Sequence, residues 1–205
     1  MTSFYDRWIL DPLLDRAMRL PPFPKQREKT IPSATGYVLE IGAGSGLNLE
    51  YYNPDSVEQL WALEPSEPAR KRAATRARSL RFPVTFLPHG AERIPLGDAV
   101  VDTVVLTYVL CTIPDVTTAL AEIKRVLRPD GSLVFTEHGK APDGGPSRIQ
   151  NLLNPIWKRL AGGCHLNRSA HELLSNAGFN VEATSDYLPG PRWLSYHTWG
   201  VARVA

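Results

Sequence analysis

A short β-rich run that ends in a glycine-rich turn constrains the fold of this chain more than any other feature. The run YVLEI at residues 37–41 is followed directly by Gly42-Ala-Gly-Ser-Gly46. Because glycine has no Cβ, such a loop can turn tightly and bring its backbone close to a ligand. We expect a helix to open near residues 47–52, where its free N–H groups would contribute to the same site. The loop therefore predicts a ligand site at the end of a strand.

The residue at position 47 separates this loop from one class of cofactor site. A dinucleotide fingerprint that begins at Gly42 needs glycine or alanine at position 47, and this chain has Leu47 there. The sequence therefore disfavours an NAD-dependent oxidoreductase, which we keep as an alternative.

Short β-rich runs alternate with helical runs from Gly36 onward, and this alternation predicts parallel strands joined by helices. Strands are expected at residues 37–41, 59–64, 84–88, 102–110, 132–137, 180–187 and 196–204. Further helices are expected at residues 67–79, 114–127, 147–160 and 169–178, with a turn at Pro129-Asp130-Gly131. A chain of 205 residues with 43% hydrophobic content suits one α/β domain, which we place at residues 36–205.

Residues 1–35 are predicted to form a helical lid segment in front of this domain. Apolar side chains recur there at helical spacing: Phe4, Tyr5, Trp8, Ile9, Leu13, Leu14 and Met18. The prolines at positions 21, 22 and 24 are expected to end the helix. Tyr5 and Trp8 either form an aromatic lid over a ligand or belong to a plain amphipathic helix that packs on the core.

A carboxylate ends the second expected strand. Glu64 closes the run QLWALE and is followed by Pro65. At this position it can accept hydrogen bonds from both hydroxyls of a ribose. The alternative is a surface glutamate that opens a turn. The glycine-rich loop nearby favours the ribose interpretation.

Three later segments resemble motifs of one enzyme family. They are HGAERIPL at residues 89–96, DTVVLTY at 102–108 and RVLRPDG at 125–131. With the acidic-x-Gly-x-Gly-x-Gly pattern of residues 40–46, they resemble class I S-adenosylmethionine-dependent methyltransferases across residues 36–140. The resemblance implies an α/β, Rossmann-like fold: a seven-stranded, mostly parallel sheet with helices on both faces and an antiparallel C-terminal hairpin. It also implies S-adenosylmethionine as the cofactor.

The same resemblance assigns the cofactor-binding residues. Those near the adenine would be Gly90, Ala91 and Glu92, and those near the methionine part Thr107 and Tyr108. The full set is Glu40, Gly42, Ala43, Gly44, Gly46, Asn48, Glu64, Pro65, Ser66, Gly90, Ala91, Glu92, Thr107 and Tyr108. The chain departs from the family pattern at Gly90, which replaces an acidic residue, and at Asp130, which replaces a glycine. A side-chain bond to the adenine amino group therefore cannot come from position 90.

The C-terminal third bears on the methyl acceptor. Residues 110–114, 136–138, 154–157 and 160–168 resemble the thiol S-methyltransferases of this superfamily and their bacterial relatives. Related branches methylate phosphatidylethanolamine or quinone precursors. A thiol, with an ordinary pKa of about 8.5, loses its proton more readily than an amine at about 10.4. We expect a small-molecule acceptor and favour a thiol; the alternatives are a phospholipid amine, a quinone precursor, or a cofactor-binding domain without turnover.

Two residues are candidates for the chemistry. His138, just past the fifth strand, either acts as a base or bonds to a neighbouring loop, and Tyr108 is the second candidate. Cys164, His165 and His171 have irregular spacing for metal ligands, so we favour a structural role and expect no metal. Cys111 follows a buried strand and is expected to pack in the core.

Charge and composition bear on partners and location. The net charge is +2, and the basic residues between 70 and 81 are expected to form the solvated face of a helix, so we expect no nucleic acid partner. No run approaches the roughly 18 apolar residues of a membrane span, which leaves at most peripheral membrane contact. Two cysteines and the lack of a secretory leader favour the cytoplasm. The sequence does not indicate an oligomeric state.

Overall fold

The structure, a computed structural model, describes residues 11–205, which form a seven-stranded sheet in the order β3-β2-β1-β4-β5-β7-β6. The strands are β1 (Gly36–Ile41), β2 (Val57–Leu63), β3 (Val84–Leu87), β4 (Val101–Thr107), β5 (Leu127–His138), β6 (Phe179–Tyr187) and β7 (Tyr196–Val204). Strands β1 to β5 pair in parallel, whereas β7 runs antiparallel to both β5 and β6. The predicted fold class is confirmed.

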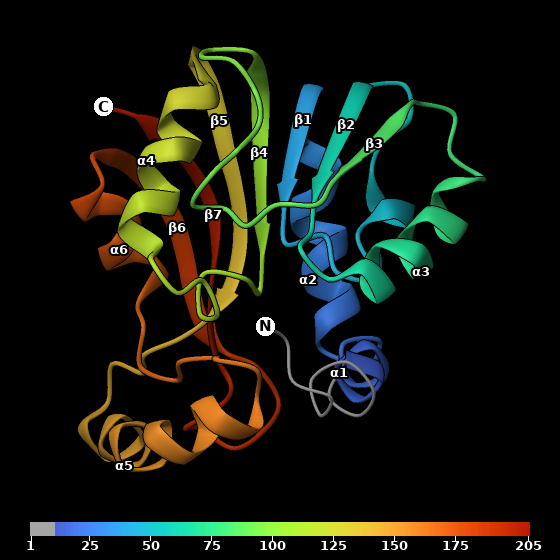
Figure 1. Cartoon of the computed structure of the whole chain (residues 1–205). Helices are drawn as coiled ribbons and strands as arrows, with labels where there is room; N and C mark the ends of the chain where they lie inside the picture. The colour runs from blue at the N-terminus through green and yellow to red at the C-terminus, as the bar shows by residue number, and fades with distance from the viewer. Residues whose placement is uncertain (1–10) are drawn as a thin grey trace.

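The strand order reverses between β1 and β4, which lie side by side in parallel register. Open α/β sheets bind ligands beyond the carboxyl ends of the strands at such a point. Figure 1 shows the arrowheads of β1, β4 and β5 at the lower edge of the sheet, with helices α1 and α5 below that edge on either side. The topology therefore places a site between these two helices.

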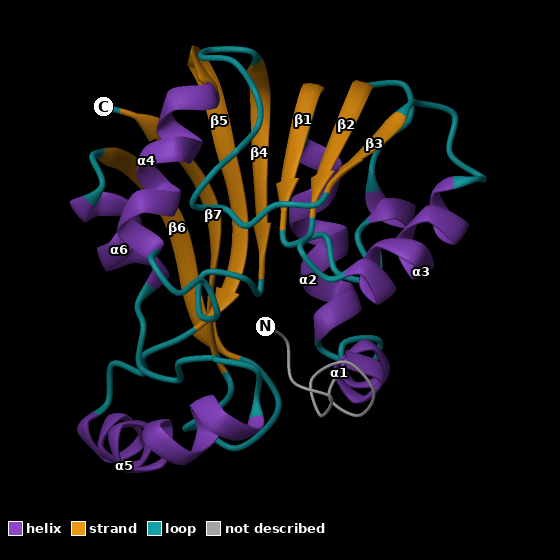
Figure 2. Cartoon of the chain, viewed as in Figure 1, coloured by secondary structure: helices purple, strands orange, loops and turns teal. Residues whose placement is uncertain are grey.

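Helices surround the sheet, as the colouring in Figure 2 makes plain. They are α1 (Asp11–Ala17), α2 (Phe23–Thr30), α3 (Glu67–Ala77), α4 (Val116–Val126), α5 (Gly144–Leu160) and α6 (Ala170–Asn176). Single 3-10 turns span Ile31–Ser33 and Leu49–Tyr51. Serine or aspartate caps the N-terminus of three helices: Ser66, Asp115 and Ser169 each accept a backbone N–H of the first turn.

Both faces of the sheet are buried, as a near-continuous apolar strand predicts. In β1, Leu39 and Ile41 join the larger core, which includes apolar residues of α4 and α6. Val38, which precedes Leu39, faces a second core with Ile31 and Val105. Two cores on opposite faces fix the register of β1, since a slip by one residue would exchange them.

Three local expectations are wrong in detail. The helix expected at residues 47–52 is only the 3-10 turn Leu49–Tyr51. Strand β4 ends at Thr107 instead of residue 110, because Tyr108 takes a φ of 55°, in the left-handed region. The turn expected at residues 129–131 lies within β5, whose pairing with β4 shifts register at Val101.

The N-terminal segment holds a helix that the sequence did not predict. Pro24 lies in the first turn of α2, where the missing N–H costs nothing, so the prolines start this helix as well as ending α1. Ile31 and Ala34, just beyond α2, belong to the second core and therefore to the body of the domain. Tyr5 and Trp8 lie outside the described residues.

Candidate active site

A cavity of about 500 Å³ opens at the carboxyl ends of the strands. Its size and mainly apolar wall are typical of a small-molecule site. The predicted site residues that line it are Glu40, Gly42, Ala43, Gly44, Asn48, Glu64, Ser66, Thr107, Tyr108 and His138. The predicted residues Gly46, Pro65, Gly90, Ala91 and Glu92 do not contribute to this wall.

The three glycines of the loop after β1 have positive φ angles but different surroundings. A Cβ on Gly42 would collide with Val109, and one on Gly46 would lie 2.7 Å from Leu49 and 3.0 Å from Ala73 of α3. Within 4 Å, a Cβ on Gly44 would meet only the Gly42 carbonyl oxygen among the described residues, at 3.9 Å. Gly42 and Gly46 thus satisfy packing, whereas Gly44 leaves open space in the cavity wall.

Glu64 connects the tip of β2 to the glycine-rich loop. Its Oε2 accepts the Gly44 N–H at 2.9 Å, and its Oε1 accepts the Ser66 N–H at 2.7 Å. The residue is 9% exposed and lines the cavity. A carboxylate with two oxygens has lone pairs left for further donors. Glu64 is therefore not the exposed surface glutamate of the alternative interpretation.

A buried polar network forms the wall below β1. Glu40 accepts the Asn48 side-chain amide at 2.8 Å and the Tyr52 hydroxyl at 2.9 Å. Asn48 in turn accepts the Arg27 Nε–H at 2.9 Å, which brings α2 into the site. Burial raises the pKa of Glu40 to about 7, against the hydrogen bonds from Tyr52 and Asn48 and the charge of Arg27, which lower it. The network presents an acidic and a basic side chain to one cavity.

Three rings meet where β4 ends. The Tyr108 hydroxyl lies 3.2 Å from His197 Nδ1, and Phe23 of α2 packs edge-on to Tyr108 at 5.1 Å between ring centroids. Burial, followed by the charge of His138, lowers the pKa of His197 to about 3, so this ring is neutral. Burial also raises the pKa of Tyr108. This part of the cavity wall is therefore uncharged, with the phenol and the imidazole in hydrogen-bond contact.

The predicted base His138 contacts a cysteine. Its Nε2 lies 3.1 Å from Cys164 Sγ. The sulfur of Cys111 lies within 4.8 Å of both atoms. Burial alone would lower the pKa of His138, but the hydrogen bond to Cys164 and the charges of Cys164 and Glu137 outweigh it, so the pKa is raised. The hydrogen bond from Cys111 lowers the pKa of Cys164, and the same contact raises that of Cys111. These contacts place Cys111 beside the predicted base His138, and it is also buried in the core.

The three residues expected at the adenine, Gly90, Ala91 and Glu92, do not line the cavity described above. Ala91 is buried in the larger core, and Glu92 Oε1 accepts the Asp115 N–H at 3.3 Å in front of α4. A Cβ on Gly90 would lie 2.7 Å from Glu92 Oε2. The adenine contact assigned to these residues stays a prediction.

The basic helix α3 is used within the molecule. Arg70 donates to the carbonyls of Glu64 and Pro65 at 2.6 and 2.8 Å. Arg76 donates to the backbone and side chain of Ser45 and contacts Asp15 of α1 at 3.3 Å. Arg70 thus joins α3 to the tip of β2, and Arg76 joins α3 to α1 and the glycine-rich loop.

Several cavity residues were not predicted. Arg27 and Phe23 belong to the missed helix α2, and the position of Pro24 was the signal that could have found it. His197 faces His138 across the antiparallel pair of β5 and β7. The alternation of β7 could have placed it inward, but only with the register of that pair known.

Similarity to known proteins identifies the family of this chain. Residues 39–135 match a family model described as a methyltransferase domain. The human thiol S-methyltransferase TMT1B is 32% identical over 197 residues, which cover 91% of this chain and 78% of that protein. The chain belongs to the class I S-adenosylmethionine-dependent methyltransferases. The predicted family and its cofactor, S-adenosylmethionine, are confirmed by this membership.

Other methyltransferases show how far the likeness extends. A ubiquinone/menaquinone biosynthesis C-methyltransferase of Campylobacter jejuni is 29% identical over 150 residues, 72% of this chain and 60% of that protein. A solved S-adenosylmethionine-dependent methyltransferase from Methanosarcina mazei superposes with a TM-score of 0.66 at 20% identity, covering 90% of this chain and 98% of that one. This methyltransferase spans 65% of the length of its rat and mouse thiol S-methyltransferase relatives.

Proposed function

We propose that this protein transfers the methyl group of S-adenosylmethionine to a small molecule, with a thiol as the favoured acceptor. The observation that carries the proposal is one cavity whose wall contains both the cofactor motif, Gly44 and Glu64, and a base with two thiols, His138, Cys111 and Cys164. An apolar cavity that holds the cofactor and the methyl acceptor together provides the alignment and water exclusion that an in-line displacement needs.

The residues present fit the cofactor. The open space at Gly44 leaves room for the nucleoside, and Glu64 beside it would accept the ribose hydroxyls. Arg27 and Glu40 present opposite charges in the same wall, and these would receive the carboxylate and ammonium of the methionine part. The bound cofactor supplies an electrophilic methyl on a positively charged sulfur. The chain itself binds, aligns and excludes water.

The apolar wall and the His138 side chain support a thiol acceptor. A thiol that enters this wall must lose its proton before attack, and His138 is the neighbouring group that can accept it. The human thiol S-methyltransferases TMT1A and TMT1B, each 32% identical to this chain, support that chemistry by resemblance. The C-methyltransferase relative favours a quinone precursor as the second candidate.

The acceptor class can be tested with labelled cofactor. Purified protein would be incubated with methyl-labelled S-adenosylmethionine and, separately, an apolar thiol, phosphatidylethanolamine vesicles and a quinone precursor. We expect label on the thiol. Label on the lipid or the quinone precursor alone would refute the thiol proposal, and cofactor binding without transfer to any of them would favour a domain without turnover.

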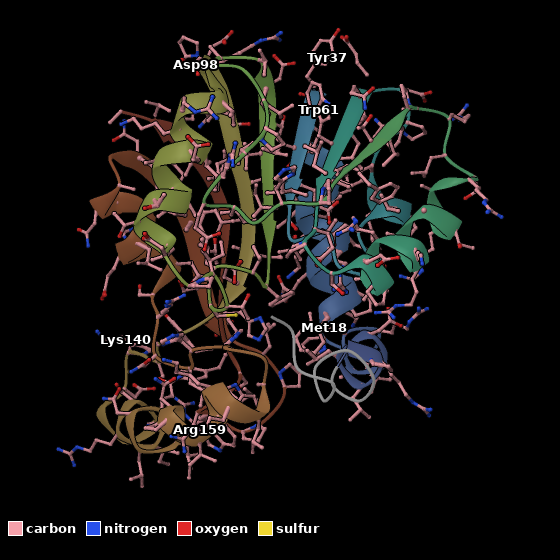
Figure 3. All side chains as sticks on the ribbon, viewed as in Figure 1. Met18, Tyr37, Trp61, Asp98, Lys140 and Arg159 are labelled. Atoms are coloured by element: carbon pink, nitrogen blue, oxygen red, sulfur yellow. The ribbon has the colours of Figure 1, made fainter. Side chains whose placement is uncertain are left out.

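The mouth of the site also supports contact with an anionic bilayer. Helix α5 exposes an apolar stripe of Ile149, Leu152, Ile156 and Leu160, of which Leu152 is 76% exposed. The helix contains Arg148, Lys158 and Arg159 but no acidic residue, a charge pattern that complements anionic lipid. Arg159 stands at the lower end of the molecule in Figure 3. Within residues 11–205, no helix combines the length and apolar character needed to cross a bilayer. We also propose a cytoplasmic location, in which α5 faces such a membrane surface.

A further inference from the structure

Three side chains from distant parts of the chain meet in the cavity wall. Cys111 follows β4, His138 ends β5 and Cys164 lies in the turn after α5. One atom of each, two sulfurs and an imidazole nitrogen, lies within 4.8 Å of the others, and all three residues line the cavity. Both cysteines are free thiols.

Main-chain contacts hold this group in place independently of its sulfurs. The His165 N–H donates to the Cys111 carbonyl at 2.9 Å. Arg168 donates to the carbonyls of Leu110 and Ile113, each at 2.7 Å. The loop after α5 is thus fastened to the loop after β4. The ligand atoms are brought together by the fold, which is the preorganisation a metal site requires.

The donor set suits a thiophilic cation. Zinc binds cysteine sulfur at about 2.3 Å and histidine nitrogen at about 2.0 Å in a tetrahedron, so the ligand atoms of two cysteines and one histidine lie about 3.5 to 3.8 Å apart. The 3.1 Å separation of His138 Nε2 from Cys164 Sγ is already close to this range, and atoms within 4.8 Å reach it with small side-chain movements. Two thiols and one imidazole make the three-ligand set of a catalytic zinc site, in which the fourth position stays open.

We propose that Cys111, His138 and Cys164 bind a divalent thiophilic cation, Zn²⁺ by its chemistry, whose fourth position faces the cavity and takes the acceptor sulfur. The part that concerns the acceptor rests on the proposed function. Each of the two cysteines loses its thiol proton to solvent when the metal binds. The acceptor thiol does the same on coordination and becomes a thiolate, so in the metal-bound protein His138 serves as a ligand and the metal takes over the activation that His138 would give as a base in the metal-free protein.

The methyl transfer then balances in atoms and charge. The acceptor thiolate supplies an electron pair to the methyl carbon as the bond from that carbon to the sulfonium breaks. The breaking pair stays on the departing sulfur, which becomes a neutral thioether. The acceptor leaves the metal as a thioether, a weaker ligand than the thiolate, so the fourth position is free again.

A buried carboxylate adds to the attraction for a cation. Glu137 directly precedes His138, and its Oε1 accepts the N–H groups of Val109 and Leu110 at 2.8 and 3.1 Å. Its Oε2 is buried and has no hydrogen-bond partner in the described part of the chain. The negative charge of this carboxylate would attract a cation that is bound by the two cysteines.

Metal binding can be measured without turnover. The full chain would be purified with a phosphine reductant, freed of metal, and titrated with Co²⁺ as a spectroscopic substitute for Zn²⁺. We expect one ion per chain, with sulfur-to-metal charge-transfer bands and the d–d bands of tetrahedral cobalt. An apolar thiol added afterwards should shift the d–d bands as it enters the fourth position. Bands that the thiol leaves unchanged would overturn the acceptor part alone.

Matched variants assign the ligands. Cys164→Ser and His138→Ala should each weaken Co²⁺ binding at least about 10-fold, whereas His171→Ala, an exposed histidine outside the group, should leave it unchanged. Cys164→His, which keeps a ligand at that position, should restore binding, so a folding defect cannot imitate the result. Equal Co²⁺ binding by the native chain and Cys164→Ser would overturn the proposal. Because cofactor binding is followed separately by calorimetry, this outcome differs from failure of the methyltransferase proposal.

Discussion

Gly44 is the residue at which the cofactor hypothesis is most directly exposed to experiment. Its φ of 55° is strained for any side chain, and a Cβ there would enter open space in the cavity wall. Gly44→Val should therefore weaken S-adenosylmethionine binding at least about 100-fold, equivalent to about 2.7 kcal/mol. Isothermal calorimetry measures this. Gly145→Ala is the control, because a Cβ at that exposed position would meet no neighbouring atom within 4 Å among residues 11–205. Unchanged affinity in Gly44→Val would refute the placement.

Glu64 is expected to act on both the cofactor and the loop. Glu64→Ala should weaken S-adenosylmethionine binding by about 1.5 to 3 kcal/mol if the carboxylate accepts two ribose hydroxyls. The change also removes the acceptor of the Gly44 and Ser66 N–H groups, so the melting temperature of the protein without cofactor should fall. Glu58→Ala, an exposed position on β2, is the control. A lower melting temperature with unchanged affinity would mean that Glu64 only holds the loop.

The raised pKa of Glu40 predicts that the stability of the protein depends on pH. Its pKa is about 7 in the folded protein and 4.5 when unperturbed, so between these pH values the folded state binds more protons than the unfolded state. The free energy of unfolding therefore falls as pH rises through this window, by up to about 3 kcal/mol. Glu40→Gln removes the titration. In urea unfolding, the stability of the variant relative to the native chain should rise from pH 5 to pH 8. A difference that is constant with pH would contradict the prediction.

At the scale of elements, the sequence predicted the sheet better than the site. Strands β1, β2 and β4 contain runs of β-branched or apolar residues, and this signal is local. Tyr108 ends β4 through a left-handed backbone angle that no propensity of tyrosine indicates. Arg27 enters the site through a hydrogen bond to Asn48, 21 residues further along the chain. The group of Cys111, His138 and Cys164 likewise depends on contacts between distant segments. Pairwise spacing along the chain could not predict these meetings.

The stripe on α5 gives a second prediction at this scale. Leu152→Asp places a charge in the middle of the apolar face, so co-sedimentation with vesicles of phosphatidylcholine and phosphatidylserine should fall at least about 10-fold. Methyl transfer to a water-soluble thiol should be unchanged, since Leu152 does not line the cavity. Ser175→Asp on α6 carries the same charge change at an exposed position and should bind vesicles normally. Equal binding by both variants would exclude the stripe as the membrane surface.

For the whole molecule, the cofactor site connects α1 and α2 to β1 and the glycine-rich loop. Arg76 links α1 to the glycine-rich loop through Asp15 and Ser45, and Arg27 links α2 to β1 through Asn48. A ligand that touches all of these walls should stabilise the fold as a unit. At 100 times its dissociation constant, S-adenosylmethionine contributes about 2.7 kcal/mol, which for a chain of this length raises the melting temperature by about 5 to 10 °C. Scanning calorimetry should show this shift, and NAD should produce none, because Leu47 occupies the position where a dinucleotide loop needs glycine or alanine. A shift with NAD and not with S-adenosylmethionine would contradict the cofactor assignment, whereas a shift that persists in Gly44→Val would mean that the ligand stabilises the chain from another site.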